Sequence, residues 1–376
     1  MSRQAPFTVY EFFAGGGMAR IGLGPRWTCL FANDIDAAKA AAYRANFGEG
    51  HIRLADVWDL SAADLPGRAD LAWASSPCQD VSLAGPREGL SGKRSSAFWG
   101  FWRLIEQLDA EGRAPRAIGI ENVTGLLTSH AGADFAAVCA ALASLGYGFG
   151  ALEIDAARFV PQSRPRMFLL AVRGPSVETV AWPGDFHSPA VRSAFAMLSP
   201  ALKARWLWWR LPEPARRNTS FADLLEPDEA VRWLDAAQTR RLIALMSPLH
   251  RAKLDQALAG PGRQVGTAFR RTRVEAGRRV QRAEVRFDGL AGCLRTPAGG
   301  SSRQFVLVVQ DGEVRARLLA PREAARLMGL PEDYCLPSTA TAALHLAGDG
   351  VVAPVVRHLA AHILEPLLTA SAKAAA

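Results

Sequence analysis

The alternation of short β-rich runs with amphipathic helical stretches through residues 1–173 constrains the fold most strongly. Most of the apolar runs end in a polar or glycine-containing turn, and a helix-like segment follows. Parallel strands need long crossover connections, usually helices, so this order is typical of a parallel sheet covered by helices. The sequence therefore predicts an α/β fold built on a Rossmann-like, doubly wound and mostly parallel sheet.

The individual elements follow from the period of the apolar residues. We expect strands at 7–13, 27–32, 70–74, 118–120 and 167–172, and helices at 36–46, 98–108, 133–145 and 321–328. A long helix at 351–368 is expected to close the fold, and the alanine-rich tail after Thr369 is expected to be unstructured.

The composition changes at Gly174, where Pro, Trp and Arg become frequent. Residues 174–290 hold 19 Lys and Arg against 12 Asp and Glu, so this segment carries nearly all of the formal net charge of +8. Such a basic segment indicates a polyanionic partner. The predicted domains are a catalytic and cofactor-binding domain at 1–173, a smaller basic domain at 174–290, a returning motif at 291–318, and helices at 319–370 that complete the first domain.

Several classes of protein are disfavoured by the composition. The apolar stretches are shorter than the ~20 residues of a membrane span, and the N-terminus has no signal-like segment. Five scattered cysteines without a CxxC pair argue against a disulfide framework and against a cysteine-based zinc site. We therefore expect a cytoplasmic protein with neither a metal nor a membrane anchor. A monomer is a separate expectation.

A glycine-rich turn joins the first strand to a helix, in the sequence Phe13-Ala14-Gly15-Gly16-Gly17. Glycines at a strand-to-helix turn let a ligand approach the backbone closely, so the turn predicts a nucleotide-like cofactor. A purely structural turn is the alternative. The motif lacks the Gly-Lys-Ser/Thr of a phosphate loop, which disfavours ATP hydrolysis.

Two acids extend this expected cofactor site. Asp34 ends the second strand and is placed to accept both ribose hydroxyls, and Asp56 is placed to meet an adenine amino group. The residues that follow them, Ile35 and Val57, are expected to line the same adenosine site. The alternative for each acid is a structural role, as a helix N-cap or as a solvated charge in a loop. On this evidence NAD remains possible as the cofactor.

Cys78 lies in the sequence Ser75-Ser76-Pro77-Cys78-Gln79, just after the strand at 70–74. In a parallel sheet the carboxyl end of a strand is the active-site rim, and a proline before the cysteine stiffens the turn. This position favours a nucleophile offered to the crevice. The alternative is a small buried apolar residue, which is how most free cysteines behave.

With these residues in place, the chain resembles the C5 cytosine DNA methyltransferase family over most of its length. The family's Pro-Cys-Gln loop corresponds to residues 77–79, and its Glu-Asn-Val motif corresponds to residues 121–123. Its Gln-x-Arg-x-Arg motif corresponds to Gln162, Arg164 and Arg166, and its closing motif to residues 348–354. Together with the glycine turn, these are five motifs in the family's order.

The resemblance implies S-adenosylmethionine as the cofactor and duplex DNA as the substrate. It implies that Cys78 adds to C6 of a flipped-out cytosine, which activates C5 toward the methyl group. Glu121 would neutralise charge at N3, and Arg164 would bind O2 or orient this cluster, with Arg166 supporting it. Pro77, Asp349 and Gly350 join Phe13, Ala14, Gly15, Gly17 and the two acids in the implied cofactor site.

The resemblance also implies where DNA is contacted. Residues 81–98 resemble the family's mobile loop, so Gln79, Ser82, Arg94 and Ser95 are expected at the DNA. The basic segment corresponds to the target-recognition region, where Arg270, Arg271 and Arg273 would grip phosphates or read bases, and Arg303 belongs to the motif that follows. A solvated charged face and an ordinary exposed loop are the alternatives.

Two positions depart from the family pattern. Met18 stands where a second glycine of the turn is usual, and Asp349 stands where asparagine is typical. Three other functions stay open: an RNA or transfer-RNA cytosine methyltransferase, a catalytically silent DNA-binding regulator, and a nicotinamide oxidoreductase. A partner restriction endonuclease in the cell and association with the nucleoid are further expectations from the resemblance.

Overall fold

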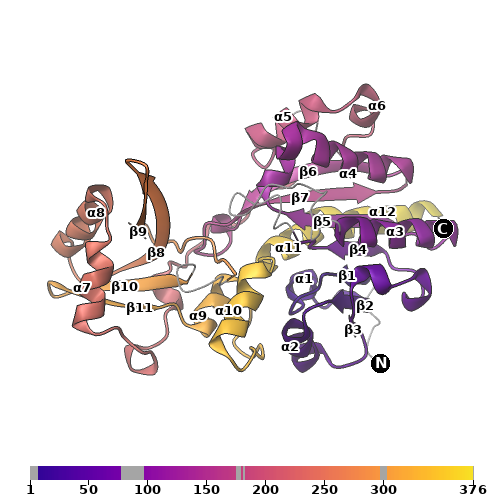
Figure 1. The fold of residues 1–376 in the computed structure, drawn as a ribbon. Coiled ribbons are helices and arrows are strands. Elements are labelled where there is room, and N and C mark those ends of the chain that lie inside the picture. The colour runs from indigo at the N-terminus through magenta and orange to yellow at the C-terminus, as the bar shows by residue number, and fades with distance from the viewer. Residues whose placement is uncertain (1–6, 78–96, 175–178, 181–182, 297–302, 376) are drawn as a thin grey trace. The chain divides into compact units, whose positions relative to one another are not determined.

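The computed structural model describes residues 7–77, 97–174, 179–180, 183–296 and 303–375 (Figure 1). The chain divides into two compact units, which are described one at a time. The first unit comprises residues 1–155, 165–214 and 351–376, and the second comprises residues 156–164 and 215–350. This division follows packing, whereas the predicted boundaries at 173, 290 and 318 divide the chain by role and stay predictions.

The first unit is built on a seven-stranded sheet of order β3-β2-β1-β4-β5-β7-β6. In that order the strands are Ile52–Leu54, Trp27–Asp34, Phe7–Phe12, Leu71–Ala74, Ala117–Asn122, Pro165–Val172 and Gly148–Asp155. Only β7 runs against its neighbours β5 and β6, and the other described pairings are parallel. The predicted α/β fold with a mostly parallel, doubly wound sheet is confirmed.

Helices cover both faces of this sheet because successive strand residues point to opposite sides. On one face, α3 (Ala97–Ala110) and α4 (Ala133–Ser144) pack against a core that includes Phe12 and Ile120. On the other face, Cys29 of β2 contacts Tyr43 of α2 (Ala37–Phe47). Other α-helices described in this unit are α1 (Met18–Leu23), α5 (Pro189–Met197), α6 (Pro200–Lys203), α11 (Ala353–Leu359) and α12 (Glu365–Ala375).

The tryptophans at 206, 208 and 209 extend the β6 edge of the first unit. The amide of Leu207 donates to the Phe149 carbonyl at 2.7 Å, and the Trp209 indole donates to the Gly150 carbonyl at 2.8 Å. Trp206 stacks edge-on against Phe149. These rings therefore complete an aromatic core, which is what bulky apolar side chains do where an edge strand would otherwise be uncovered.

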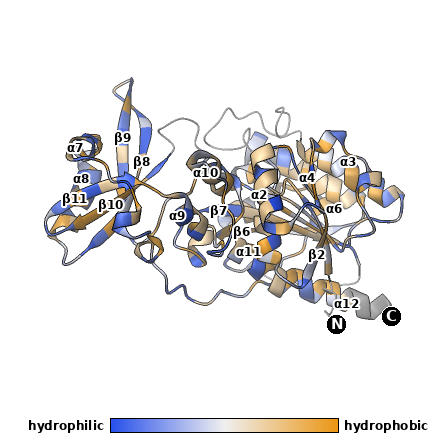
Figure 2. Ribbon diagram, turned by 90° about the horizontal axis from the view of Figure 1, so that it is seen from below, coloured by the Kyte–Doolittle hydropathy of each residue, from blue (hydrophilic) through white to orange (hydrophobic). Residues whose placement is uncertain are grey.

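The second unit holds a four-stranded antiparallel sheet of order β11-β10-β8-β9. Its strands are Glu313–Leu318, Gln304–Gln310, Gln264–Glu275 and Arg278–Arg286 in that order. Helices α7 (Ala236–Ala244) and α8 (Pro248–Ala259) share with the sheet a core that includes Leu242, Leu254 and Leu307. Helices α9 (Pro321–Leu327) and α10 (Ala340–Asp349) follow the sheet. Figure 2 shows the polar residues concentrated along β8 and β9.

The C-terminal segment differs from its prediction. A π-helical turn at Ala360–Leu364 interrupts the closing helix, and α12 continues to Ala375, so the prediction of an unstructured tail after Thr369 is wrong. Alanine has the highest helix propensity, and no breaker separates the tail from α12. Within the described residues, Ala340–Ala370 passes a length-and-hydropathy test for a membrane span, but 61% of its apolar window is buried in the fold. Such burial is typical of helices packed in a protein core.

Substitution of Gly22 tests the packing of α1 on α11. A Cβ there would lie 2.5 Å from both the Ala353 carbonyl oxygen and the Val356 Cβ. Gly22→Ala is expected to lower the free energy of unfolding by about 1–3 kcal/mol, although alanine favours helix by about 1 kcal/mol. Chemical denaturation measures this. Gly50→Ala is the matched control, because nothing lies within 4 Å of its Cβ position. Equal stability of the two variants would show that α1 does not pack as described.

Candidate active site

The candidate site lies where the order of the parallel strands reverses. Strands β1 and β4 are neighbours in the sheet, and the chain leaves them toward opposite edges. Ligands of open α/β sheets bind outside the carboxyl ends of the strands at such a point, because the two connections diverge there. The glycine turn follows β1, and Ser75-Ser76-Pro77 follows β4.

The glycine turn has a backbone that glycine makes possible. Phe13, Gly15 and Gly17 all have positive φ, of 55°, 55° and 78°. The amide of Ala14 donates to the Asn33 carbonyl at 2.8 Å, and the amide of Gly15 donates to the Asp34 carboxylate at 2.8 Å. The turn is therefore fastened to the end of the neighbouring strand β2.

The two φ-positive glycines face different surroundings. A Cβ at Gly17 would lie 2.3 Å from the Phe47 ring, whereas a Cβ at Gly15 would meet nothing within 4 Å. Open space next to Gly15 is what a ligand lying against the backbone requires. Nearby, Ile35 follows the end of β2 and is 67% exposed, an unusual exposure for a large aliphatic side chain. Met18 is buried at the start of α1.

The two predicted cofactor acids already hold backbone amides. The Asp34 carboxylate accepts from Gly15 and, at 2.8 Å, from the amide of Asp36, and its burial raises its pKa above the ordinary value. One oxygen of Asp56 accepts from the Trp58 amide at 3.0 Å and caps the short 3-10 helix Val57–Asp59. Val57 itself is buried. A carboxylate oxygen has two lone pairs, so these bonds leave acceptor capacity for ribose or adenine.

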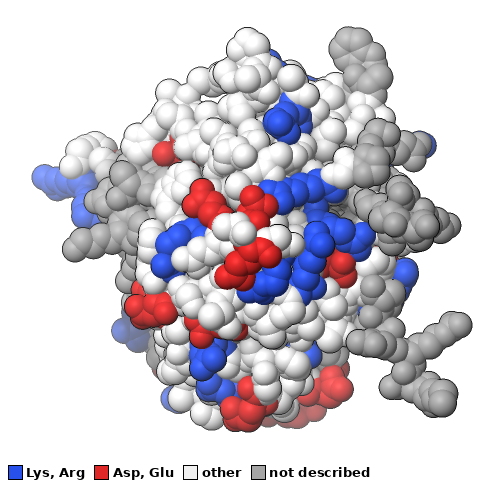
Figure 3. Space-filling view, turned by 90° about the vertical axis from the view of Figure 1, so that its right-hand side faces the viewer, with Lys and Arg blue, Asp and Glu red and all other residues white. Residues whose placement is uncertain are grey.

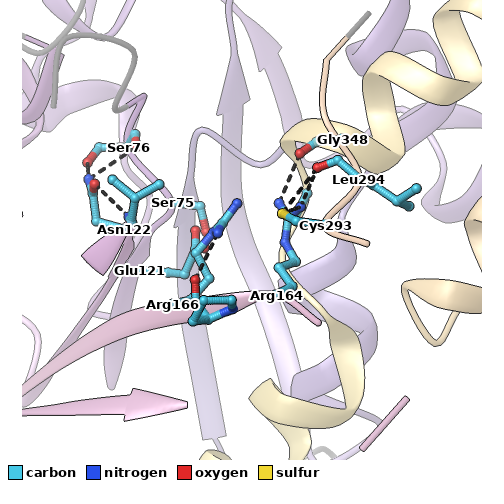
Figure 4. A network of polar contacts seen from close by, with 12 residues as sticks. Ser75, Ser76, Glu121, Asn122, Arg164, Arg166, Cys293, Leu294 and Gly348 are labelled. Carbon is cyan, nitrogen blue, oxygen red and sulfur yellow. Dashed lines mark hydrogen bonds and ion pairs between the residues drawn. The ribbon is translucent and has the colours of Figure 1, made fainter. Parts of the chain in front are cut away.

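Strand β5 ends in the pair Glu121-Asn122, beside the end of β4. The Asn122 amide group donates to the Ser76 hydroxyl at 3.2 Å, and its carbonyl oxygen accepts from the Val123 amide at 2.8 Å (Figure 4). Both side chains of the pair are nearly fully buried. Asn122 therefore ties the segment that leads into the predicted nucleophile to the strand that carries Glu121. Ser75 and the exposed Pro77 are described, whereas Cys78, Gln79, Ser82, Arg94 and Ser95 lie outside the described residues.

The two motif arginines have different partners. Arg166, in β7, forms an ion pair with Glu121 at 3.2 Å, and both side chains are largely buried (Figure 4). Strand β7 pairs with β5 and thereby brings the two residues together. Among the four candidate catalytic residues, this is the one direct contact described within the first unit. It joins a carboxylate to a cation in a place where water is scarce.

Arg164 acts within the second unit. Its guanidinium is 2% exposed and donates to the carbonyls of Leu294, Gly348 and Gly350 at 2.9, 2.9 and 2.7 Å. Gln162, also fully buried, donates to the Leu327 carbonyl and accepts from the Leu294 amide. The alternating motif thus gathers three distant segments of the second unit through buried polar contacts.

Asp349 and Gly350 belong to one of these gathered segments. The Thr296 hydroxyl donates to the Asp349 carboxylate, and a Cβ at Gly348 would lie 2.6 Å from the backbone of residues 295–296. Close backbone approach explains the glycine at 348. The negative charge at position 349 therefore has a hydroxyl donor inside its own unit.

Four of the predicted DNA-contacting arginines, at positions 270, 271, 273 and 303, lie in the second unit. Arg271 and Arg273 form ion pairs with Glu284, and Arg270 lies 5.4 Å from the centre of the Phe305 ring. Arg303 donates to the Thr341 hydroxyl at 2.6 Å. Figure 3 shows a face of the first unit, on which basic and acidic side chains are mixed. No group of three or more metal-ligating side chains occurs in the described part of the chain.

Glu11 is a site residue that the sequence reasoning missed. Its carboxylate, 1% exposed inside β1, accepts from the Arg20 amide at 3.2 Å and so holds the start of α1 under the glycine turn. Burial, and to a smaller extent the nearby Asp34 charge, raises its pKa to about 8. An acid inside the otherwise apolar stretch Phe7–Phe12 was the available signal.

The sheet order, the glycine turn and the polar ends of β4 and β5 define an α/β transferase of the S-adenosylmethionine-dependent methyltransferase fold. Comparison with known proteins agrees: a model of the C-5 cytosine-specific DNA methylase family matches residues 7–365. The chain belongs to this family, and it is a DNA (cytosine-5) methyltransferase.

Similar proteins cover nearly the whole chain. The type II methyltransferase M.NlaX of Neisseria lactamica is 26% identical over 360 residues, spanning 94% of this chain and 95% of that protein. M.HhaI of Haemophilus parahaemolyticus is 24% identical over 360 residues, spanning 94% and 93%. The crystal structure of S. pombe Dnmt2 methyltransferase has the same fold, with a TM-score of 0.61, 19% identity, and coverage of 96% of this chain and 99% of that one.

Glu11 predicts a pH dependence of stability. Its pKa is about 8 in the fold and near 4.5 when unfolded, so its contribution is fullest below pH 4.5 and is lost as pH rises to about 8. Glu11→Gln keeps an acceptor for Arg20 and is expected to remove this decline, worth up to roughly 5 kcal/mol at about 1.4 kcal/mol per pH unit. Denaturation from pH 5 to 9 measures it. The exposed Glu49→Gln is the control and is expected to retain the decline. An unchanged decline in Glu11→Gln would contradict the assignment.

Proposed function

We propose that this methyltransferase acts on cytosine in duplex DNA through covalent addition of the Cys78 thiolate to C6. The observation that carries the proposal is the Asn122–Ser76 hydrogen bond. It fixes the chain two residues before Cys78 to the residue next to Glu121. A nucleophile and an acid that serve one small ring must be fixed in register with each other, because misplacement by an ångström is costly.

The cofactor proposal is supported by the environment of the glycine turn. Gly15 borders open space, Asp34 retains acceptor capacity for the ribose, and the exposed Ile35 offers an apolar surface for adenine. Phe13, Ala14, Gly17, Asp56, Val57 and Pro77 complete the proposed binding set, with Asp349 and Gly350 from the closing motif. When bound there, S-adenosylmethionine supplies an electrophilic methyl group on sulfur.

The chemistry assigned to this chain's residues begins at Cys78. C5 of cytosine is a poor nucleophile until the thiolate bonds to C6, which makes C5 enamine-like. Glu121, in its protonated form, donates to N3 as negative charge develops on the ring. After C5 is alkylated, a base removes the C5 proton, the C6–S bond breaks, and the proton at N3 returns to Glu121. The cytosine must leave the base stack for this to happen.

Arg166 and Arg164 receive different roles. The Arg166–Glu121 ion pair supports Arg166 as the cation that orients Glu121 and stabilises charge on the ring. The three backbone carbonyls bound by Arg164 support a positioning role, since both of its Nη groups donate inside the second unit. This assignment exchanges the roles expected from the sequence, in which Arg164 binds O2 or orients the cluster and Arg166 supports it.

Duplex DNA is favoured over RNA as the substrate. The second unit offers a basic two-stranded ribbon, and curated relatives along nearly the whole chain are type II methyltransferases. A silent regulator would not need the tie between Ser76 and Asn122, and a nicotinamide oxidoreductase would not need a cysteine there. We further propose a cytoplasmic monomer that associates with the nucleoid through DNA and serves beside a cognate restriction endonuclease.

Cys78→Ala is expected to abolish methyl transfer while DNA binding persists, because only the covalent step needs sulfur. Transfer of label from S-adenosylmethionine to DNA and a binding titration measure the two. Cys139→Ala is the matched control, since that thiol is buried in α4 and is expected to leave transfer intact. A duplex that contains 5-fluorocytosine is expected to trap a covalent adduct on Cys78. Full activity of Cys78→Ala would refute the mechanism.

The same substitution at the two arginines separates their roles. Arg166→Lys keeps the charge but loses the guanidinium fork, so we expect kcat to fall about 10²-fold with stability changed by under about 1 kcal/mol. Arg164→Lys leaves buried carbonyl groups without hydrogen-bond donors, so it is expected to lower the free energy of unfolding by about 2–4 kcal/mol. Single-turnover kinetics and denaturation provide the comparison. A large stability loss confined to Arg166→Lys would reverse the assignment.

A further inference from the structure

The hairpin formed by β8 and β9 extends beyond its sheet. Strand β10 pairs with β8 only from Gln264 to Phe269, whereas the β8–β9 pairing continues to Glu275 and Arg278. Residues 270–275 and 278–283 therefore form a two-stranded ribbon, which rises past β10 in Figure 1. We call these residues the ribbon. A two-stranded β-ribbon has the width that the major groove of B-DNA admits.

The pairing register divides the ribbon into two faces, because opposite residues share a face and successive residues alternate. The first face carries the pairs Arg271↔Arg282, Arg273↔Val280 and Glu275↔Arg278. The second face carries Arg270↔Ala283, Thr272↔Gln281 and Val274↔Arg279.

The first face is held together by ion pairs. Glu284, the next acid along this face, binds Arg271 at 3.2 Å and also binds Arg273. Glu275 binds Arg282, with one contact at 2.8 Å. Ion pairs at such exposed positions add little stability, but they restrict the side chains and neutralise part of the charge. This face therefore has a fixed arrangement of charges.

The outer part of the second face carries a different chemistry. Thr272, Val274, Arg279 and Gln281 are all exposed, and Val274 reaches 73% exposure. Within the described residues, no hydrogen bond or ion pair engages the side chains of these four. An exposed valine on a ribbon tip among polar residues with unused donors and acceptors indicates a binding surface.

These four side chains match the edges of base pairs. Arginine binds guanine O6 and N7, glutamine binds adenine N6 and N7, and the methyl groups of threonine and valine contact the thymine methyl group. Resting on the proposed function, we propose that the second face of the ribbon reads base sequence in the major groove. Thr272, Val274, Arg279 and Gln281 determine the recognition sequence. The first face maintains the ribbon and contacts phosphates.

Two adjacent arginines provide a matched test. Arg278 and Arg279 are both exposed, occupy the tip, and lie on opposite faces. Arg279→Ala is expected to relax the preference at one base position by 5- to 150-fold, which corresponds to about 1–3 kcal/mol. Arg278→Ala is expected to weaken binding to all sequences alike and to lower the salt-dependence slope by roughly 1.

The first measurement is selection of the full chain on a random duplex pool, followed by sequencing of the bound fraction. It needs no methyl transfer, so it stays informative even if the proposed reaction fails. The second measurement maps methylated cytosines on the same pool. A changed base preference in the Arg279→Ala variant, together with an unchanged base preference in the Arg278→Ala variant, supports the proposal that the second face reads base sequence. Gln281→Ala is the second variant and is expected to change a different base position.

Several outcomes would contradict the proposal that the second face of the ribbon reads base sequence. One is an unchanged recognition sequence in both Arg279→Ala and Gln281→Ala. Another is a wild-type chain that binds the pool without preference. If these variants leave binding and methylation untouched, the ribbon serves another partner, such as a protein. The chain could methylate no cytosine and still bind DNA selectively, with a selectivity that Arg279→Ala alters. This outcome would refute the proposed reaction and support base reading by the second face of the ribbon.

Discussion

The adjacency of β1 and β4 in a parallel sheet is the constraint on which the first unit's site depends. Because parallel strands end at one edge, the residues after β1, β2, β4 and β5 converge without any loop having to reach across the fold. Hydrogen bonds then fix the spacing: Asp34 holds the glycine turn, and Asn122 holds Ser76. The sheet backbone determines where the site residues lie, and hydrogen bonds from buried polar side chains fix the distances between them.

Buried polar contacts stabilise each unit internally at its chemically important places. Glu11 beneath the glycine turn, the Arg166–Glu121 pair and the Arg164 carbonyl cluster all lie where water is excluded. Such groups cost free energy unless they are satisfied, so each restricts its surroundings to one arrangement. The buried pair of Arg317 and Glu323, which are 1% and 0% exposed, does the same for β11 and α9 in the second unit.

In the second unit, the basic residues of the ribbon are divided between its two faces. On one face of the ribbon, carboxylates restrain the arginines, and on the other, polar and apolar tips project without such partners in the described residues. The alternation of strand residues makes this separation possible within residues 270–284. Composition alone reports the positive charge of this stretch but not the division into faces.

The sequence by itself determined the sheet, the glycine turn and the family, because these depend on short-range patterns of apolar period, turn residues and motif spacing. It placed Glu121 and the acids Asp34 and Asp56 at strand ends. It did not reveal the pairing of Arg166 with Glu121, the buried Glu11, or the packing of the tryptophans at 206, 208 and 209 on the β6 edge. Those outcomes depend on partners far along the chain, such as Glu121 for Arg166. Only tertiary packing selects such partners, since burial and competing hydrogen bonds are decided by the whole fold.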